Sequence, residues 1–199
     1  YVTSSNCISG GICTGVGVGP SAVQDVMGVM KAYTTRVGAG PFPTELSGDM
    51  GEMLLCKGGE YGATTGRARR CGWLDLVVVE HAVRLNGLTS LAITKLDVLG
   101  GLKTIKVATA YEIDGKRMEH FPAQVRHAER AVPIYDELVG WPDWKPEESA
   151  GLAAKGMAAL PKALREYVRF IEKQMGVKAS IISIGKDRAD TIDLRKKKW

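Results

Sequence analysis

Apolar positions follow two spacings along this chain, and together they predict an α/β protein. Short apolar runs typical of buried strands occupy residues 91–94, 105–111 and 181–185. An Asp-Gly pair at residues 114–115 predicts a hairpin turn, with an antiparallel partner strand near residues 117–121. Because helices and strands alternate through the second half of the chain, we expect a largely parallel sheet with helices on both of its faces.

Helical spacing of apolar residues predicts four helices. A capping box that starts at Ser21 precedes the first of them, which we expect over residues 21–33. The others are expected over residues 51–57, 73–86 and 161–175, the last beginning at a proline and ending at a glycine. Residues 122–159 are interrupted by prolines and carry little periodic pattern.

Composition sets the broad class of the protein. The chain has 199 residues, 45% of them hydrophobic and 25% charged, which suits one domain or a large piece of one. No apolar run reaches membrane length and no signal-peptide pattern is present, so we expect a cytoplasmic protein without a membrane partner. The four cysteines form no C-x-x-C pair and predict buried thiols. The chain opens at Tyr1 in what reads as a strand, so we expect a piece of a longer protein.

A polar stretch over residues 60–75 is the strongest chemical signal. It combines hydroxyls at Thr64 and Thr65 with glycines and three arginines. Glycine lets backbone N–H groups approach a ligand, and guanidinium groups pair with carboxylate or phosphate through two hydrogen bonds. The stretch therefore predicts a loop that binds a small polyanion. The alternative is a solvated basic turn.

A second signal follows the apolar run at residues 91–94. Asp97 could accept hydrogen bonds from N1–H and the 2-amino group of guanine, and Lys95 could cover the purine face. Residues 183–185 follow another apolar run and could close the other side of the base. A surface ion pair is the alternative for Lys95 and Asp97. The G-x-x-x-x-G-K-[ST] phosphate loop occurs nowhere in the sequence, so the predicted nucleotide site is incomplete.

Several blocks together resemble the adenylosuccinate synthetase family, in that family's order. They comprise residues 1–6, 31–45, 62–75, 94–99 and 183–188, and the match extends across the whole chain but covers only the C-terminal half of such an enzyme. The fold implied is part of a P-loop-like nucleotide-binding fold with a mostly parallel sheet and antiparallel additions. Residues 1–90 would carry the IMP and aspartate loops, and residues 91–199 the guanine-binding part, of one domain.

The resemblance implies a ligase of purine and AMP biosynthesis. GTP would phosphorylate O6 of IMP, and the amine of L-aspartate would then displace that phosphate to give adenylosuccinate. Mg²⁺ would take part, with its ligands in the absent N-terminal half, so no metal ligand is expected here. The catalytic residues would also lie in that half, which would be a necessary partner. We therefore expect the 199-residue chain alone to be inactive. Family members are homodimers.

The resemblance also implies ligand contacts at individual positions. Thr3 would touch the IMP phosphate and Val37 its sugar. The aspartate loop would comprise Ala63, Thr64, Thr65, Gly66, Arg67, Ala68 and Arg69. Within it, Thr64, Thr65 and Arg67 would be the main contacts to aspartate, Arg67 would also lie near the IMP ribose, and Arg69 would reach the GTP side. The guanine pocket would comprise Lys95, Leu96, Asp97, Ser183, Ile184 and Gly185.

Two other classes of protein are compatible with parts of the pattern. A guanine-nucleotide switch protein would use Lys95 and Asp97, but it would need the missing phosphate loop and carries Asn where this chain has Thr94. A nucleic-acid-binding module would use the arginines of residues 67–70 and the basic C-terminal run. The net charge of +5 and the lack of interleaved aromatic residues make nucleic acid a poor expectation as a partner.

Overall fold

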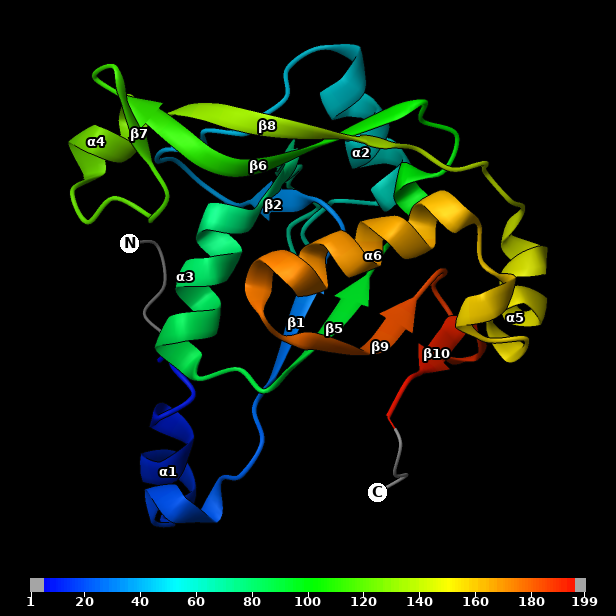
Figure 1. Cartoon of the computed structure of the whole chain (residues 1–199), viewed down its shortest axis with the longest axis horizontal. Helices are drawn as coiled ribbons and strands as arrows, with labels where there is room; N and C mark the ends of the chain where they lie inside the picture. The colour runs from blue at the N-terminus through cyan, green and yellow to red at the C-terminus, as the bar shows by residue number, and fades with distance from the viewer. Residues whose placement is uncertain (1–5, 196–199) are drawn as a thin grey trace.

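A four-stranded sheet at the centre of the fold joins strands from distant parts of the chain (Figure 1). The computed structural model describes residues 6–195. The strand order is β1 (Met27–Lys31), β5 (Ser90–Thr94), β9 (Lys178–Ser183) and β10 (Thr191–Asp193). The first three strands run parallel and β10 is antiparallel to β9, so the carboxyl ends of β1, β5 and β9 reach the same edge of the sheet.

A second sheet lies over the upper part of the molecule and is mostly antiparallel (Figure 1). It consists of β4 (Leu74–Asp75), β6 (Thr104–Ile113), β7 (Lys116–Met118) and β8 (Val132–Val139), with β6 pairing all three others. The predicted hairpin turn is confirmed: Asp114 and Gly115 join β6 to β7 with φ of 53° and 73°. A separate two-stranded sheet pairs β2 (Thr34–Arg36) with β3 (Arg70–Gly72).

Six α-helices and four short 3-10 turns complete the described part of the chain. The helices are α1 (Gly11–Val16), α2 (Asp49–Gly58), α3 (Leu76–Asn86), α4 (Val125–Glu129), α5 (Pro146–Ala154) and α6 (Lys162–Met175). The 3-10 turns are η1 (Pro20–Ala22), η2 (Asp97–Leu99), η3 (Met157–Ala159) and η4 (Arg188–Asp190). Across residues 6–195, no helix combines the length and the apolar character that a membrane crossing requires.

Local sequence explains where the longer helices begin and end. Asp75 caps the N-terminus of helix α3. Its Oδ1 accepts hydrogen bonds from the backbone N–H groups of Val77 and Val78. The helix ends at Gly87 in the left-handed conformation, with φ of 58°. Helix α6 follows Pro161 and ends at Gly176 in the same way, with φ of 67°. These helices therefore confirm the predicted helices over 73–86 and 161–175 to within three residues.

The main hydrophobic core draws on both halves of the chain. It includes Tyr33, Leu54, Ile93, Leu164 and Ile182, each at most 2% exposed. Helix α6 is tied to the central sheet by the hydroxyl of Tyr167, which donates a hydrogen bond of 2.6 Å to the backbone carbonyl of Ala32 beyond β1. The predicted α/β class with a mostly parallel sheet is confirmed.

The helix expected over residues 21–33 is wrong. Only η1 is helical there, and Met27–Lys31 form β1, which pairs in parallel register with β5 from Met27 opposite Ser90 to Lys31 opposite Thr94. The spacing of Val23, Val26, Met27 and Met30 fits a helix, but pairing with a buried central strand decides the structure instead.

The expectation that the cysteines are buried is also wrong for most of them. Cys71 is buried, Cys13 is half-buried, and Cys7 and Cys56 are exposed. All four lie in the described range and remain thiols rather than disulfides.

Candidate functional site

The predicted guanine-binding residues come together at the carboxyl edge of the central sheet. Lys95 follows β5 directly, and Ile184 and Gly185 follow β9. The backbone N–H of Leu96 donates a hydrogen bond of 3.4 Å to the carbonyl oxygen of Ser183, so the two segments are in direct contact. Ligands of open α/β sheets bind at this edge.

Two adjoining cavities open beside these strand ends. One, of about 310 Å³, is lined by Lys95, Asp97, Ser183 and Gly185 together with residues of α2. The other, of about 300 Å³, shares Asp97 and Gly185 with the first and extends to Trp144. Their volumes suit parts of a nucleotide rather than a large cofactor.

Asp97 lines both cavities and carries a buried acceptor without a partner among the described residues. Its Oδ1 atom is buried and has no hydrogen-bond partner within the described part of the structure. Burial raises the pKa of this carboxyl group, although Lys95 and Lys57 act in the opposite direction. Buried acceptors are nearly always hydrogen-bonded in folded proteins, so an unpaired one on a residue that lines two cavities marks Asp97 as a candidate contact for a ligand that donates hydrogen bonds.

Leu96 and Ile184 lie at the site but turn their side chains into the core. Both residues are 0% exposed. Their carbonyl oxygens are also engaged: Leu96 accepts from Nε1 of Trp141 at 3.3 Å, and Ile184 accepts from Nε1 of Trp144 at 3.3 Å. Leu96 and Ile184 therefore support the pocket from the core side.

Sequence reasoning missed Trp144. Its indole N–H also donates to the hydroxyl of Ser149 at 3.1 Å, and the residue lines the second cavity. It lies in the stretch 122–159, whose proline-rich pattern gives no local signal of contact with a strand end 40 residues away. Gly185 lines the same cavity, and a Cβ atom there would lie 2.2 Å from Oδ2 of Asp190, so a larger residue would displace the Asp190 side chain.

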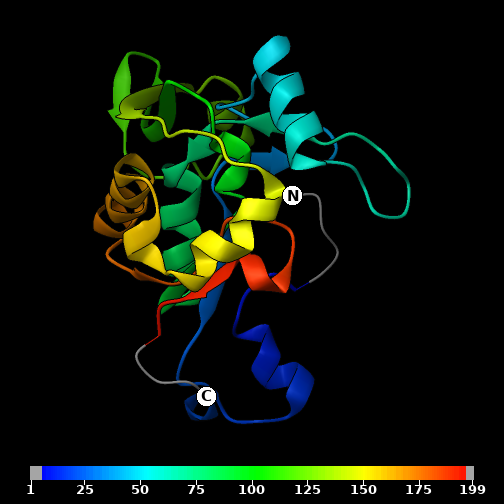
Figure 2. The same ribbon diagram turned by 90° about the vertical axis from the view of Figure 1, so that its right-hand side faces the viewer.

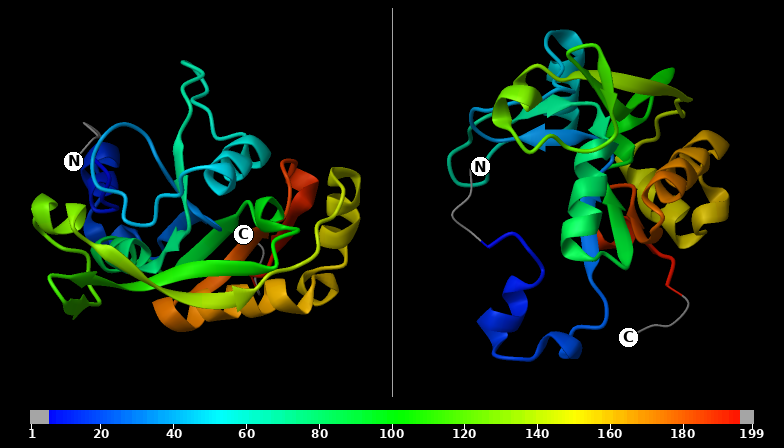
Figure 3. Two further views of the ribbon diagram at one scale, coloured as in Figure 1. Left: turned by 90° about the horizontal axis from the view of Figure 1, so that it is seen from above. Right: turned by 60° about the vertical axis from the view of Figure 1, so that its left-hand side comes forward.

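The predicted aspartate loop extends from the body of the molecule as a long hairpin (Figures 2 and 3). Its base is held by the bridge between Tyr61 and Ala68 and by a hydrogen bond of 2.8 Å from Gly62 N–H to Arg67 O. Residues 63–68 are exposed. Thr64, Thr65 and Arg67 are therefore accessible from solvent, and the Thr65 hydroxyl also accepts a hydrogen bond of 3.4 Å from the backbone N–H of Arg67.

The three arginines of the loop region have different surroundings. Arg67 is exposed, whereas Arg69 donates from Nη1 to Oε2 of Glu60 at 2.9 Å. Arg70 pairs through Nε and Nη2 with both carboxylate oxygens of Glu45, at 2.6 and 2.5 Å. Arg70 also donates to the carbonyl of Gly40 at 2.9 Å, so it anchors the neighbouring loop rather than facing a ligand.

Of the two residues predicted to contact IMP, Val37 is described by the structure and Thr3 is not. Val37 follows β2 and is 55% exposed. Because Arg36 pairs with Arg70 across β2 and β3, Val37 and Arg69 leave the two-stranded sheet at the same end. The structure thus brings Val37 beside the arginine loop. Thr3 lies outside the described residues.

A buried carboxylate, Glu60, connects the two predicted sites, and sequence reasoning missed it. Its side chain is 0% exposed and accepts hydrogen bonds from Lys31 and Tyr33, each at 2.6 Å, and from Arg69 at 2.9 Å. Nζ of Lys95 lies 3.4 Å from the same carboxylate. Burial raises the pKa of Glu60, but the hydrogen bonds from Lys31, Tyr33 and Arg69 outweigh it and lower the pKa to about 2.

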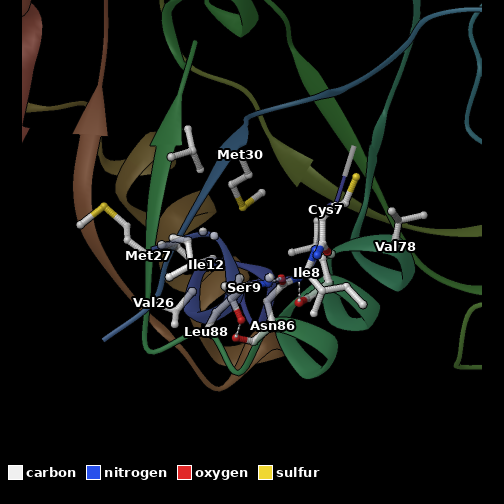
Figure 4. Close-up of a pocket in the computed structure, with 18 of the residues that line it drawn as sticks. Cys7, Ile8, Ser9, Ile12, Val26, Met27, Met30, Val78, Asn86 and Leu88 are labelled. Carbon is white, nitrogen blue, oxygen red and sulfur yellow. Dashed lines mark hydrogen bonds between the residues drawn. The ribbon is translucent and has the colours of Figure 1, made fainter. Parts of the chain in front are cut away.

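Another cavity has a different character (Figure 4). It measures about 700 Å³ and lies between β1, α3 and the segment around α1. Its described lining residues are mostly apolar and include no charged side chain, while Ser9 is fixed by hydrogen bonds of 2.8 and 2.9 Å to Asn86. The described lining of this cavity shares no residue with the two cavities beside Asp97.

Comparison with known proteins identifies the family. The adenylosuccinate synthetase family model matches residues 1–192. This chain belongs to the adenylosuccinate synthetase family. The adenylosuccinate synthetase of Thermodesulfovibrio yellowstonii is 50% identical over 192 residues, which cover 96% of this chain and 44% of that protein.

Solved structures support the same family at the level of the fold. The structure described as fully ligated adenylosuccinate synthetase from Plasmodium falciparum superposes with a TM-score of 0.89 at 36% identity and covers 97% of this chain and 45% of that one. The succinoaminodeoxyadenylate synthetase of cyanophage S-2L, at 14% identity and a TM-score of 0.50, shares the fold only. The family match does not favour the switch-protein and nucleic-acid alternatives.

The chain spans less than half the length of the adenylosuccinate synthetases that it matches. Within residues 6–195, no group of three or more His, Cys, Asp and Glu side chains is arranged as a metal site. No Mg²⁺ ligand is therefore assigned to the described residues.

Proposed function

We propose that this chain supplies the aspartate loop and the guanine pocket of a GTP-dependent ligase that joins IMP to L-aspartate. In that reaction the γ-phosphoryl group of GTP is transferred to O6 of IMP and leaves GDP. The amine of aspartate then attacks C6, the C6–O6 bond breaks, and inorganic phosphate departs with O6. Adenylosuccinate is the product. Phosphorylation matters because it converts O6 into a good leaving group.

The unpaired oxygen of Asp97 carries the proposal. A carboxylate in a cavity at the end of β5 can accept from N1–H and the 2-amino group of guanine, which supplies the donors that the buried oxygen lacks. Adenine presents an acceptor at N1 and has no 2-amino group, so the same carboxylate disfavours ATP. Lys95, Leu96, Ser183, Ile184 and Gly185 would complete the pocket.

The exposed loop would bind the two carboxylates of aspartate. Thr64, Thr65 and Arg67 are the proposed main contacts, because hydroxyl and guanidinium donors match an amino diacid. Arg67 would also lie near the IMP ribose and Arg69 would reach the GTP side. Among the IMP contacts we propose Val37 and Thr3. The positive charge of the loop would offset repulsion between the phosphates and the diacid.

The remaining parts of the machinery would lie outside this chain. The phosphate loop, the catalytic residues and the ligands of Mg²⁺, which would neutralise the transferring phosphoryl group, belong to the other half of the protein in this proposal. Residues 1–90 would then serve IMP and aspartate, and residues 91–199 guanine, within one domain. A cytoplasmic homodimer is the assembly that the family resemblance implies.

Replacement of Asp97 by asparagine in the full-length protein tests the guanine assignment. We expect Asp97→Asn to lower kcat/KM for GTP by about a hundredfold, because the amide offers one acceptor and places a donor against a donor. XTP carries a 2-oxo group in place of the 2-amino group. The ratio of kcat/KM for XTP to kcat/KM for GTP should therefore rise in Asp97→Asn. The measurement is steady-state formation of adenylosuccinate with each nucleotide.

The matched control is Asp114→Asn. Asp114 lines neither cavity beside Asp97, and its exposed carboxylate pairs with Arg130 at 2.8 Å. It should change kcat/KM for GTP by less than about threefold, as expected for a surface ion pair. An unchanged preference between GTP and XTP in Asp97→Asn would overturn the guanine assignment.

A further inference from the structure

Glu60 lies where three cationic side chains from three different elements meet. Lys31 ends β1, Arg69 immediately precedes β3, and Lys95 immediately follows β5. All three nitrogen atoms lie within 3.4 Å of the Glu60 carboxylate. Tyr33 adds a fourth donor at 2.6 Å. A single buried acceptor therefore joins the base of the exposed loop to the turn that follows β5.

We propose that Glu60 is a positioning residue that couples the aspartate loop to the guanine pocket by holding Arg69 and Lys95 on one carboxylate. The inference rests on the function proposed above for these two sites and adds a connection between them. Glu60 itself touches neither ligand in this proposal. It acts through the two cations that flank it.

The distribution of the contacts over the two carboxylate oxygens supports this role. Oε2 accepts from both Lys31 and Arg69, whereas Oε1 accepts from Tyr33 and lies nearest to Lys95. Because a carboxylate is planar and rigid, a displacement of Arg69 rotates or shifts the oxygen that faces Lys95. Movement of the loop base is therefore transmitted to the guanine side through one side chain.

The Glu60 carboxylate also reduces the repulsion among the three cations around it. Three cations face one anion at this point, so the group carries two excess positive charges. Without Glu60 the cations would repel one another at short range, and solvent would screen them only in part, since Lys31, Arg69 and Lys95 are 25%, 30% and 35% exposed. Lys95 is further constrained by its backbone, with φ of 61°, and by a hydrogen bond from Nζ to the carbonyl of Gly58. Loss of the Glu60 charge would therefore leave Lys95 held by its backbone and Gly58 alone, beside two cations that are no longer neutralised.

The test is Glu60→Gln in the full-length protein, which keeps the shape and removes the charge. We expect the KM for aspartate and the KM for GTP each to rise about tenfold, because Arg69 loses a charge-assisted hydrogen bond to Glu60 and Lys95 loses an ion pair with it. The KM for IMP and kcat should change less than about threefold. A variant that merely loosens the fold would instead raise all three KM values together and lower kcat.

The matched control is Glu45→Gln, which removes the carboxylate that pairs with the neighbouring Arg70. The KM for aspartate and the KM for GTP should stay within about twofold of the wild-type values, because this ion pair is half-exposed and anchors a different loop. Unchanged KM values for aspartate and GTP in Glu60→Gln would overturn the inference, as would an equal rise for IMP.

A second variant covers the case in which Glu60→Gln does not fold. Glu60→Asp keeps the charge but withdraws the carboxylate by one methylene. We expect the KM for aspartate and the KM for GTP each to rise about threefold. Unchanged values, or an equal rise in the KM for IMP, would again overturn the inference. The proposed function fails separately: a wild-type protein that forms no adenylosuccinate from IMP, aspartate and GTP would refute it. An active wild type with unaffected Glu60 variants would refute only the coupling.

Discussion

The surroundings of single side chains set the reactivity of the cysteines. Burial is the main cause that raises the pKa of the Cys71 thiol to about 11, with Glu60 adding to the effect. Cys56 is exposed and lies on the surface of α2, with Sγ 4.0 Å from the hydroxyl of Tyr61. Since the thiolate is the reactive form, the two residues should differ sharply toward alkylating reagents.

We therefore expect iodoacetamide at pH 8 to modify Cys56 and to spare Cys71 in the native protein. At that pH, a thiol with a pKa of about 11 has roughly one molecule in a thousand as thiolate, and Cys71 is also 3% exposed. Peptide mass spectrometry after a timed reaction measures both sites. The denatured protein is the control, in which both cysteines should react. Equal labelling of the two residues in the native state would contradict the buried position of Cys71.

At the scale of an element, α3 depends on a buried cap that is also tied to the second sheet. The carboxylate of Asp75 accepts from two backbone N–H groups of α3 through Oδ1. Its Oδ2 accepts from the hydroxyl of Tyr111 on β6 at 2.5 Å. The residue is 1% exposed, so loss of this carboxylate would leave buried donors without partners.

We expect Asp75→Ala to lower the free energy of unfolding by about 3 kcal/mol, the sum of a lost helix cap and an unpaired Tyr111 hydroxyl. Tyr111→Phe removes only the second contact and should cost about 1 kcal/mol. Chemical denaturation of the two variants and the wild type gives both values. Glu137→Ala is the control, since its exposed ion pair with Lys106 should contribute less than about 0.5 kcal/mol. A loss of similar size in Glu137→Ala and Asp75→Ala would rule out the capping explanation.

Elements with a strong local pattern could be predicted from the sequence. The strand over Ser90–Thr94, the hairpin at Asp114 and Gly115, and the helix that ends at Gly176 all follow from signals within a few residues. The convergence of Lys95 and Asp97 with Ser183 was also predictable, because parallel strands end at the same edge of a sheet.

Elements that depend on distant partners could not be predicted in the same way. β1 carries helical spacing and a glycine at Gly28, yet pairing with β5 makes it a strand. β8 contains Pro133, which is tolerated because β8 pairs only with β6 and lies at an edge. Glu60 gives no local signal at all, since its partners Lys31 and Lys95 are 29 and 35 positions away in the sequence.

At the scale of the whole molecule, the described chain leaves apolar side chains uncovered along one edge. Ile8, Ile12 and Val16 near α1 are 51%, 57% and 70% exposed, and Val29 on β1 is 75% exposed. β1 is also an edge strand of the central sheet. These residues line the cavity of about 700 Å³ beside α1, so together they form an apolar surface that a soluble protein rarely exposes.

We expect the isolated 199-residue chain to bind an apolar fluorescent dye strongly and to form no adenylosuccinate from IMP, aspartate and GTP. The full-length protein should bind less dye, because further parts of the fold would cover this surface, and should be active. Dye fluorescence per mole and a product assay on both proteins give the comparison.

Two substitutions locate the dye. Val29→Thr should reduce its binding, whereas Val139→Thr, which alters an equally exposed valine on β8, should not. Product formation by the isolated chain would contradict the proposal that the catalytic groups lie elsewhere.

The hairpin of residues 61–68 has a consequence for protein engineering. Backbone pairing between Tyr61 and Ala68 closes its stem, while the residues between them make their contacts within the hairpin itself. Such a tip can be rewritten without disturbing the folded body, in the way that antibody loops vary on a constant framework. Under the proposed function, new amine substrates are therefore best sought by randomising these few exposed positions.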